Sequence, residues 1–157
     1  AQAIEDRIAQ ITQEAYDNGD YIFVAMDRHD EGDTFHPETK LFPPHNIAGT
    51  SGRELYGKLA GVYDAIKDDN RVFWMDKRHY SAFSGTDLDI RLRERRVTTV
   101  VLTGVLTDIC VLHTAIDAYN LGYDIEVVAS ATASLTPEAH DFAIGHFKNV
   151  LGATIVE

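Results

Sequence analysis

Hydrophobic residues along the chain follow two alternating spacings. Ile4, Ile8, Ile11 and Ala15 are spaced as on one face of a helix that ends near Gly19. The apolar run 21–26 follows and predicts a buried strand. The same alternation continues, with further strands predicted over 71–75, 98–103, 124–128 and 153–156, and helices over 53–66, 87–96, 111–121 and 137–149.

Alternating strands and helices with short connections are typical of an α/β fold built on a parallel sheet. We therefore expect residues 1–157 to form a single three-layer domain, with a mostly parallel sheet in Rossmann-like order and helices on both faces. In such sheets the active crevice lies off the carboxyl ends of the strands. Asp27, Lys77 and the segment 104–110 each follow a predicted strand, so we expect them at one edge.

Composition and charge indicate a globular domain and argue against nucleic acid as its partner. Hydrophobic residues make up 45% and charged residues 25% of the chain, as in an ordinary globular domain. The net charge of −11 argues against a nucleic-acid partner. No apolar run is long enough to cross a membrane. A single cysteine excludes an internal disulfide and fits a reducing compartment, so we expect a cytoplasmic protein.

That cysteine, Cys110, falls between a predicted strand and a predicted helix. Thr107 or Asp108 can cap the helix, which leaves Cys110 in its first turn. A thiol at the positive end of a helix has a favoured thiolate and is a better nucleophile. The alternative is a buried, inert thiol, which is the more usual state of a lone cysteine.

Lys77 is expected beside this cysteine, because it leaves the sheet after the strand 71–75. A lysine near a thiol can stabilise the thiolate, although one more surface lysine is the plainer interpretation of this residue alone. His140, by contrast, falls in a predicted surface helix far along the chain.

The long polar loop over 27–52 carries candidate metal ligands, and loops of this length are usually functional. Asp27 and His29 are two residues apart, so extended geometry points both side chains to the same side. His36, Glu38 and His45 follow in the loop. Such a set suits a divalent metal ion, whereas solvated loop residues are the plainer interpretation of the Asp-x-His pair alone.

Two motifs carry a resemblance to a known family. The first is Lys77-Arg78-His79-Tyr80-Ser81-Ala82-Phe83, followed by Thr86 and Leu88. The second is Thr103-Gly104-Val105-Leu106-Thr107-Asp108-Ile109-Cys110-Val111. In this order they resemble the isochorismatase-like cysteine hydrolases. Asp27-x-His29 and Phe42-Pro43-Pro44-His45 ahead of them are similar to the pyrazinamidase/nicotinamidase branch of that superfamily, and the resemblance covers residues 1–157.

The resemblance implies an enzyme that converts nicotinamide to nicotinic acid and ammonia through a thioester, in NAD salvage. It implies pyridine and pyrazine carboxamides as ligands, and we keep a homo-oligomer as an open alternative to a monomer. Cys110 is then the nucleophile and Lys77 its electrostatic partner. The amides of Leu106 and Cys110 form the oxyanion hole, and the Val105–Leu106 peptide is expected to be cis.

The resemblance also implies one divalent metal ion that holds the pyridine nitrogen of the substrate. Zinc is the first choice, with iron and manganese as alternatives. The matching ligands are Asp27, His29 and His45, with Glu38 as the remaining ligand and His36 as its alternative. Phe42, Tyr80 and Leu106 are the candidate substrate-binding residues, with the two aromatic rings expected to flank the substrate ring.

The third catalytic group of the family is an aspartate on a central strand that precedes the first helix. Residues 1–157 begin at that helix, so we expect this strand to be missing from the sheet and the chain to be N-terminally incomplete. Asp76 and Asp108 are poor substitutes. Two other hypotheses stay open: a different amidohydrolase of the superfamily, which metal analysis would distinguish, and a catalytically inactive binding module of the same fold.

Overall fold

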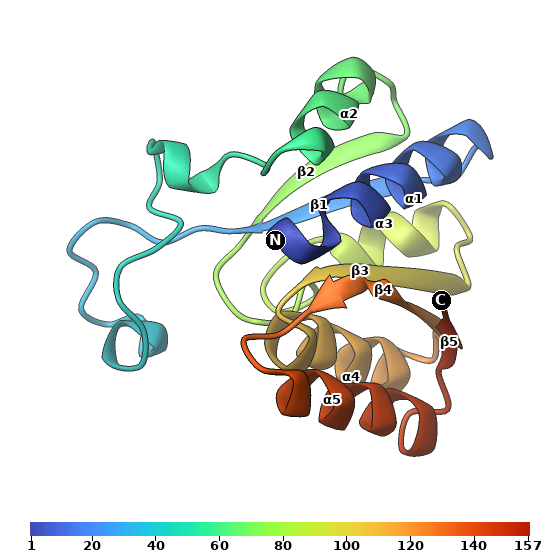
Figure 1. The fold of residues 1–157 in the computed structure, drawn as a ribbon. Coiled ribbons are helices and arrows are strands. Elements are labelled where there is room, and N and C mark those ends of the chain that lie inside the picture. Colours follow the sequence, from blue (N-terminus) through green and yellow to red (C-terminus); the bar gives the residue numbers. More distant parts are fainter.

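Strands and helices alternate along the chain as the hydrophobic pattern predicts (Figure 1). The computed structural model describes all of residues 1–157. The strands are β1 (Ile22–Asp27), β2 (Val72–Lys77), β3 (Thr99–Val105), β4 (Asp124–Ala133) and β5 (Thr154–Val156). The helices are α1 (Glu5–Asp17), α2 (Lys58–Ile66), α3 (Leu88–Glu94), α4 (Leu112–Leu121) and α5 (Pro137–Asn149). None of the helices is both long and apolar enough to span a membrane.

All strand pairs are parallel, but the strands form two sheets. β1 pairs with β2, in a register that places Asp27 opposite Lys77. β3, β4 and β5 form the second sheet in that order. The parallel α/β class is therefore confirmed. No strand pair joins the sheet of β1 and β2 to the sheet of β3, β4 and β5.

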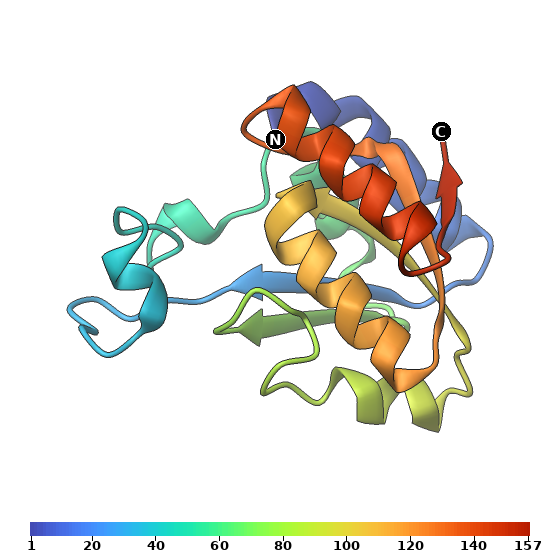
Figure 2. The same ribbon diagram turned by 90° about the horizontal axis from the view of Figure 1, so that it is seen from below.

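Helices cover both faces of the two sheets, as expected (Figures 1 and 2). α1 and α2 pack against each other on one face, where α1 contacts both β1 and β4 and so bridges the two sheets. α4 and α5 lie together on the opposite face (Figure 2). The core between the layers includes Phe147 and Val127, which are fully buried, and side chains of both sheets pack against it. Apolar burial of this kind is the main stabilising contribution to the fold.

Local end signals explain why the C-terminal helices fall where the sequence predicts. α5 begins at Pro137 after Thr136, whose side chain accepts a hydrogen bond from the backbone N–H of Ala139. α4 ends at Gly122, which adopts a positive φ of 83° that favours glycine. The predicted bounds of α5 are confirmed at both ends.

Most predicted boundaries agree with the structure to within two residues, but two differ by five. The helix predicted from residue 53 begins at Lys58, because its first turn is capped from outside: the backbone N–H of Lys58 donates to Glu5 Oε1 of α1 at 2.9 Å. The strand predicted over 124–128 continues to Ala133, since its second half pairs with the end of β3 around Gly104 and Val105.

Between β1 and α2 the chain forms a long excursion away from the sheets, drawn from blue to green in Figure 1. We call residues 28–57 the metal loop. It contains only two short 3-10 turns, Pro37–Lys40 and Ser51–Arg53, and one bridge, between His29 and Ile47. Side-chain contacts rather than regular backbone pairing must therefore set its conformation.

Candidate active site

The carboxyl ends of β1, β2 and β3 meet around Cys110, as the topology of parallel sheets predicts. Lys77 Nζ donates to Cys110 Sγ at 3.5 Å and to the carbonyl oxygen of His79 at 3.0 Å. The same ammonium group is paired with the carboxylate of Asp27. Asp27 Oδ2 also lies 4.0 Å from Cys110 Sγ. A thiol, an ammonium group and a carboxylate are thus in mutual contact.

Burial explains why Lys77 and Asp27 are paired. Lys77 is only 4% exposed, and a buried ammonium group without a partner is strongly destabilising. The register of β1 and β2 sets Asp27 directly opposite Lys77 and so supplies the counter-charge. The pairing follows from strand register rather than from local sequence.

Cys110 lies in a π-helical turn, Thr107–Val111, which continues into α4. The prediction that Thr107 or Asp108 caps the helix is wrong, because neither side chain bonds to the backbone of the turn. Thr107 Oγ1 is instead hydrogen-bonded to His140 Nδ1 of α5 at 2.9 Å, and Asp108 Oδ1 accepts from Ser134 Oγ at 2.6 Å. We call Thr107–Val111 the nucleophile turn.

The protonation state of Cys110 also differs from the prediction. Burial raises the pKa of the Cys110 thiol above its ordinary value, although the nearby Lys77 ammonium lowers it. The direction of this pKa shift is opposite to the expected favoured thiolate, because desolvation, together with the charges of Asp27 and Glu38, outweighs the Lys77 ammonium. The thiol needs a proton acceptor before it can attack, and the Asp27 carboxylate is the one in contact with it.

The Val105–Leu106 peptide bond is cis, the geometry that the resemblance implies. Leu106 immediately precedes the nucleophile turn, and its carbonyl oxygen accepts from the backbone N–H groups of Ile109 and Val111. Leu106 is therefore part of the same backbone unit as Cys110.

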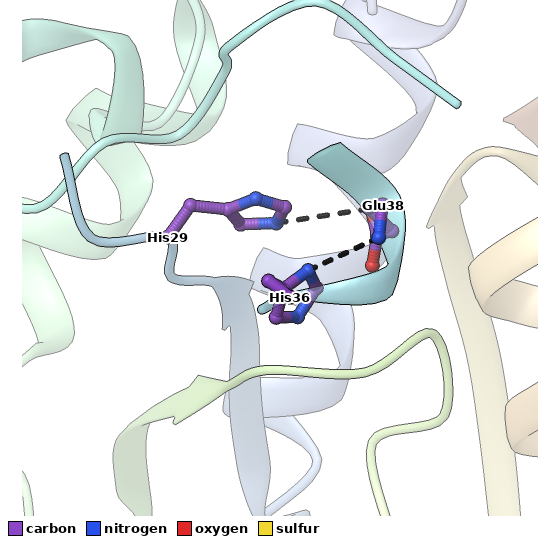
Figure 3. A group of neighbouring side chains, drawn as sticks. All are labelled: His29, His36 and Glu38. Carbon is purple, nitrogen blue, oxygen red and sulfur yellow. Dashed lines mark hydrogen bonds and ion pairs between the residues drawn. The ribbon is translucent and has the colours of Figure 1, made fainter. Parts of the chain in front are cut away.

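Three buried side chains of the metal loop form a compact donor group: His29, His36 and Glu38 (Figure 3). One ligand atom from each lies within 4.8 Å of the others. His45 joins them from the edge of the loop. Glu38 Oε2 lies 3.7 Å from His29 Nε2 and 3.6 Å from His45 Nε2.

These nitrogens have the electronic state that a metal ligand needs. His29 Nε2 is buried and has no hydrogen-bond partner. Burial, followed by the neighbouring His45, lowers the pKa of His29, so its ring is neutral. His45 Nδ1–H donates to the carbonyl of Pro43 at 2.9 Å, and His45 Nε2 on the other side of the ring lies near Glu38 Oε2. Two imidazole lone pairs that face one carboxylate oxygen fit a divalent cation of the zinc class.

His36 differs from these two histidines. Its Nδ1 accepts from the backbone N–H of Glu38 at 3.3 Å, and its Nε2–H donates to the carbonyl oxygen of Arg78. Both ring nitrogens are therefore occupied within the protein. Of the two residues considered for the remaining ligand, Glu38 has the freer donor atom.

Asp27, the residue predicted as a metal ligand together with His29, also contacts the cysteine and the lysine. The Asp27 carboxylate contacts Lys77 and Cys110, and its charge also acts on the His29 ring, so Asp27 lies between the cysteine and the donor group. The contact with Lys77 follows from the strand register described above, because it presents a buried ammonium group to Asp27. Asp76 and Asp108 are directed away from Cys110, to Arg53 and Ser134.

The aromatic substrate candidates lie beside the donor group. The Phe42 ring centroid is 6.1 Å from that of His45, and the Tyr80 centroid is 5.0 Å from that of His113. Burial raises the pKa of Tyr80, and the nearby Glu38 adds to the effect. A cavity of about 400 Å³ is lined by Pro37, Glu38, Leu41, His79, Tyr80, Ser81, Ser84, His113, Ile116 and Asp117.

The sequence pattern did not identify three residues that contact the site. His140 was expected on a surface helix but bonds to Thr107, Ser134 bonds to Asp108, and Arg78 holds the metal loop. His140 and Ser134 lie more than twenty positions from their partners in the sequence, and local periodicity carries no signal for such pairs. The Lys77–Phe83 motif contains Arg78, but its side chain was assigned no role.

The chain matches the family model of the isochorismatase domain over residues 1–156. The crystal structure of pyrazinamidase/nicotinamidase from Streptococcus mutans shares 78% identity with it, covers 99% of this chain and 86% of its own, and has a TM-score of 0.98. The structure of nicotinamidase/pyrazinamidase PncA from Bacillus subtilis shares 53% identity, with 99% and 85% coverage and a TM-score of 0.97.

One of the more distant similar structures contains zinc. The pyrazinamidase of Pyrococcus horikoshii, solved in complex with zinc, shares 27% identity, with 98% coverage of this chain and 84% of its own, and a TM-score of 0.84.

Proposed function

The chain belongs to the isochorismatase family, and from this premise we propose that it is a metal-dependent cysteine amidohydrolase that converts nicotinamide to nicotinic acid and ammonia. The observation that carries the proposal is the pairing of Lys77 with Cys110 at the same strand edge as the donor group of His29, Glu38 and His45. The nicotinamidase and pyrazinamidase relatives support the same substrate class.

The reaction we propose has two halves. Cys110 Sγ attacks the carboxamide carbon, the thiol proton passes to the amide nitrogen, and ammonia leaves as a thioester forms. Water then adds to the thioester carbon, its hydroxyl stays on the acid, and its proton returns to the sulfur. In both halves the amides of Leu106 and Cys110 would stabilise the oxyanion, and one such donor is worth about 3 kcal/mol.

Lys77 and Asp27 supply the charges near the sulfur. Desolvation makes the thiol a weak acid here, so the Lys77 ammonium at 3.5 Å is needed to stabilise the thiolate as it forms. Asp27 Oδ2, at 4.0 Å from the sulfur, is the acceptor in contact with the thiol. The family pattern assigns this proton transfer to a different aspartate, which would leave Asp27 to serve as a metal ligand.

We propose that His29, Glu38 and His45 hold the metal ion, with Asp27 as the candidate fourth ligand and His36 as the alternative to Glu38. A zinc-class ion bound there would coordinate the ring nitrogen of a pyridine or pyrazine carboxamide and so orient the ring. Phe42 and Tyr80 would flank that ring and Leu106 would contact it at the reacting end.

Ammonia release by the purified protein tests this function. We expect release from nicotinamide and pyrazinamide, loss of activity when a chelator removes the metal, and recovery when zinc is restored. Benzamide is the matched control substrate, because it has the same carboxamide but no ring nitrogen, and should react far more slowly. If the zinc-loaded protein releases no ammonia from either heterocyclic amide, the proposal is wrong.

Asp27→Asn separates the two roles of Asp27. A metal ligand would lose zinc affinity on substitution, whereas a proton acceptor would keep the metal and lose the chemical step. Zinc titration and single-turnover ammonia release on the same preparation report the two effects separately.

We further propose that the enzyme acts in NAD salvage in the cytoplasm, with a homo-oligomer as the alternative to a monomer. One observation favours a second candidate, an inactive binding module of the same fold: burial raises the pKa of the Cys110 thiol and so disfavours the nucleophilic thiolate. Nicotinamide binding without ammonia release would support that candidate.

A further inference from the structure

We propose that His36 and Arg78 are positioning residues that set the geometry of the metal site and connect it to the catalytic lysine. The proposal rests on the function proposed above and assigns roles to two residues that hold neither metal nor substrate. It is carried by a set of contacts between the metal loop and the segment that directly follows β2.

His36 acts as a bridge between the two segments. It is buried, and its Nδ1 accepts the backbone N–H of Glu38 at 3.3 Å. Its Nε2–H donates to the carbonyl oxygen of Arg78. These two bonds determine a single tautomer and tie the backbone of Glu38 to that of Arg78 through one rigid ring. A histidine used in this way has no lone pair left for a metal ion.

Arg78 holds the same loop a second time, through its side chain. Its guanidinium group donates to Asp30 Oδ2 and to Asp33 Oδ2, at 2.6 Å each. Asp33 Oδ1 in turn accepts from the backbone N–H of Phe35 at 2.9 Å and of His36 at 3.3 Å. Arg78 thus holds the chain on the N-terminal side of His36, while its carbonyl holds the ring.

The segment that makes these contacts also carries the catalytic lysine. Lys77 precedes Arg78 and points to Cys110, while the carbonyl of His79, on the other side of Arg78, accepts from Lys77 Nζ. Any shift of the Arg78 backbone therefore moves Glu38 through His36, and moves Lys77 through the chain itself.

This anchor is important because no paired strand holds the part of the metal loop that carries His36 and Glu38, and the loop has only two short 3-10 turns. Arg28 and Arg53 tie the ends of the loop to Asp76 of β2. Groups that orient metal ligands from behind typically change metal affinity about 10–100-fold when they are removed. We therefore expect Arg78 and His36 to control metal affinity even though neither touches the ion.

The chain offers a matched control for Arg78. Arg28 also contacts Asp30, at 3.5 Å, and its side chain has nearly the same exposure. Its other ion pair is with Asp76 of β2, at 3.3 Å, and no contact joins it to Asp33 or His36. In the full chain, Arg78→Ala should weaken zinc binding about tenfold or more, measured by competition with a chromophoric chelator, while Arg28→Ala should leave it unchanged. Equal affinities for Arg78→Ala and the unsubstituted protein would overturn the proposal.

A cobalt titration decides whether His36 is a positioning residue or a ligand. At saturating cobalt(II), the visible absorption bands report the number and type of ligands. His36→Gln should lower cobalt affinity but leave the shape and intensity of the saturated spectrum unchanged. A changed spectrum at saturation would mean that a nitrogen ligand has been lost, and would overturn the assignment.

The outcomes also separate this inference from the proposed function. An unsubstituted protein that binds neither zinc nor cobalt contradicts the metal-dependent function. A protein that binds zinc, with Arg78→Ala binding it equally well, contradicts only the positioning roles. Circular dichroism and thermal melting of the metal-free variants establish that each is folded before the affinities are compared.

Discussion

The nucleophile turn and the metal loop reach the same site by different means. The nucleophile turn extends from β3 into α4, and Thr107 within it is fully buried. The metal loop buries His29, His36 and Glu38, yet exposes Phe35 at 96% and Leu41 at 67% of their surface. One segment is embedded in the core of the domain, whereas the other is held mainly by hydrogen bonds and ion pairs.

This difference teaches that the two halves of the chemistry depend on different forces. The position of the sulfur depends on apolar packing of the sheet and helices, which also stabilises the fold. The positions of the metal ligands depend on polar contacts that contribute little to global stability, because most of them are partly exposed. Metal binding should therefore be separable from folding, whereas the geometry of the nucleophile should not.

Removal of the nucleophile should give the largest effect on activity, and it should leave metal binding by the metal loop unchanged. We expect Cys110→Ala to lower ammonia release by about 10³-fold or more, because no other group can form the thioester. Zinc affinity and melting temperature should stay close to those of the unsubstituted protein. Ammonia release that persists in this variant would contradict the thioester mechanism.

Loss of core packing should distinguish the two regions by stability. Phe147 of α5 is fully buried, so Phe147→Ala should lower the free energy of unfolding by about 3–5 kcal/mol in urea titrations. Phe35 of the metal loop is the matched control, and Phe35→Ala should change it by less than about 0.5 kcal/mol. A large loss for Phe35→Ala would mean that the loop is part of the stable core.

Substitution of the metal ligands should show the reverse pattern. His29→Ala and His45→Ala should each weaken zinc binding about 100-fold while the metal-free protein melts at nearly the same temperature. His146→Ala is the control, since its side chain has no hydrogen-bond partner and lies in α5 beside Phe142. Unchanged zinc content in both loop variants would show that the metal assignment is wrong.

The contact between His140 and Thr107 tests whether α5 positions the nucleophile turn. We expect His140→Ala to lower kcat about tenfold and stability by about 1–2 kcal/mol, because Thr107 Oγ1 loses its buried partner. His140→Asn can replace the Nδ1 contact and should recover much of kcat. If His140→Asn stays as slow as His140→Ala although both fold equally well, the hydrogen bond has no positioning role.

The smallest effect concerns pH and a residue far from the site. Burial, together with the hydrogen bond to Asp89, raises the pKa of Tyr123 to about 12. Because the folded pKa is raised, the stabilisation by this hydroxyl is complete below the ordinary value near 10 and is lost as pH rises toward 12. Tyr123→Phe should flatten stability between those pH values, as urea titrations can measure.

Several features of the site could be predicted because they follow from short-range pattern. The alternation between strand-like and helix-like spacing of apolar residues predicts the strands and helices. The bounds of α5 agree with those expected from Thr136, Pro137 and the apolar spacing. The rule for strand ends then brings Lys77 and Cys110 to one edge, where they lie 3.5 Å apart. These inferences need only the chain direction of each strand.

The sequence by itself determined the α/β class, the order of the elements and the set of residues at the strand ends. Only the tertiary structure decided which partners those residues take. The register of β1 and β2 pairs Asp27 with Lys77, and the packing of α5 brings His140 to within hydrogen-bond distance of Thr107. The backbone carbonyl of Arg78 accepts the hydrogen bond of His36 Nε2–H. The physical reason is that hydrogen bonding and desolvation depend on groups distant in sequence. Burial, helped by the nearby charges of Asp27 and Glu38, raises the pKa of Cys110 against the local expectation.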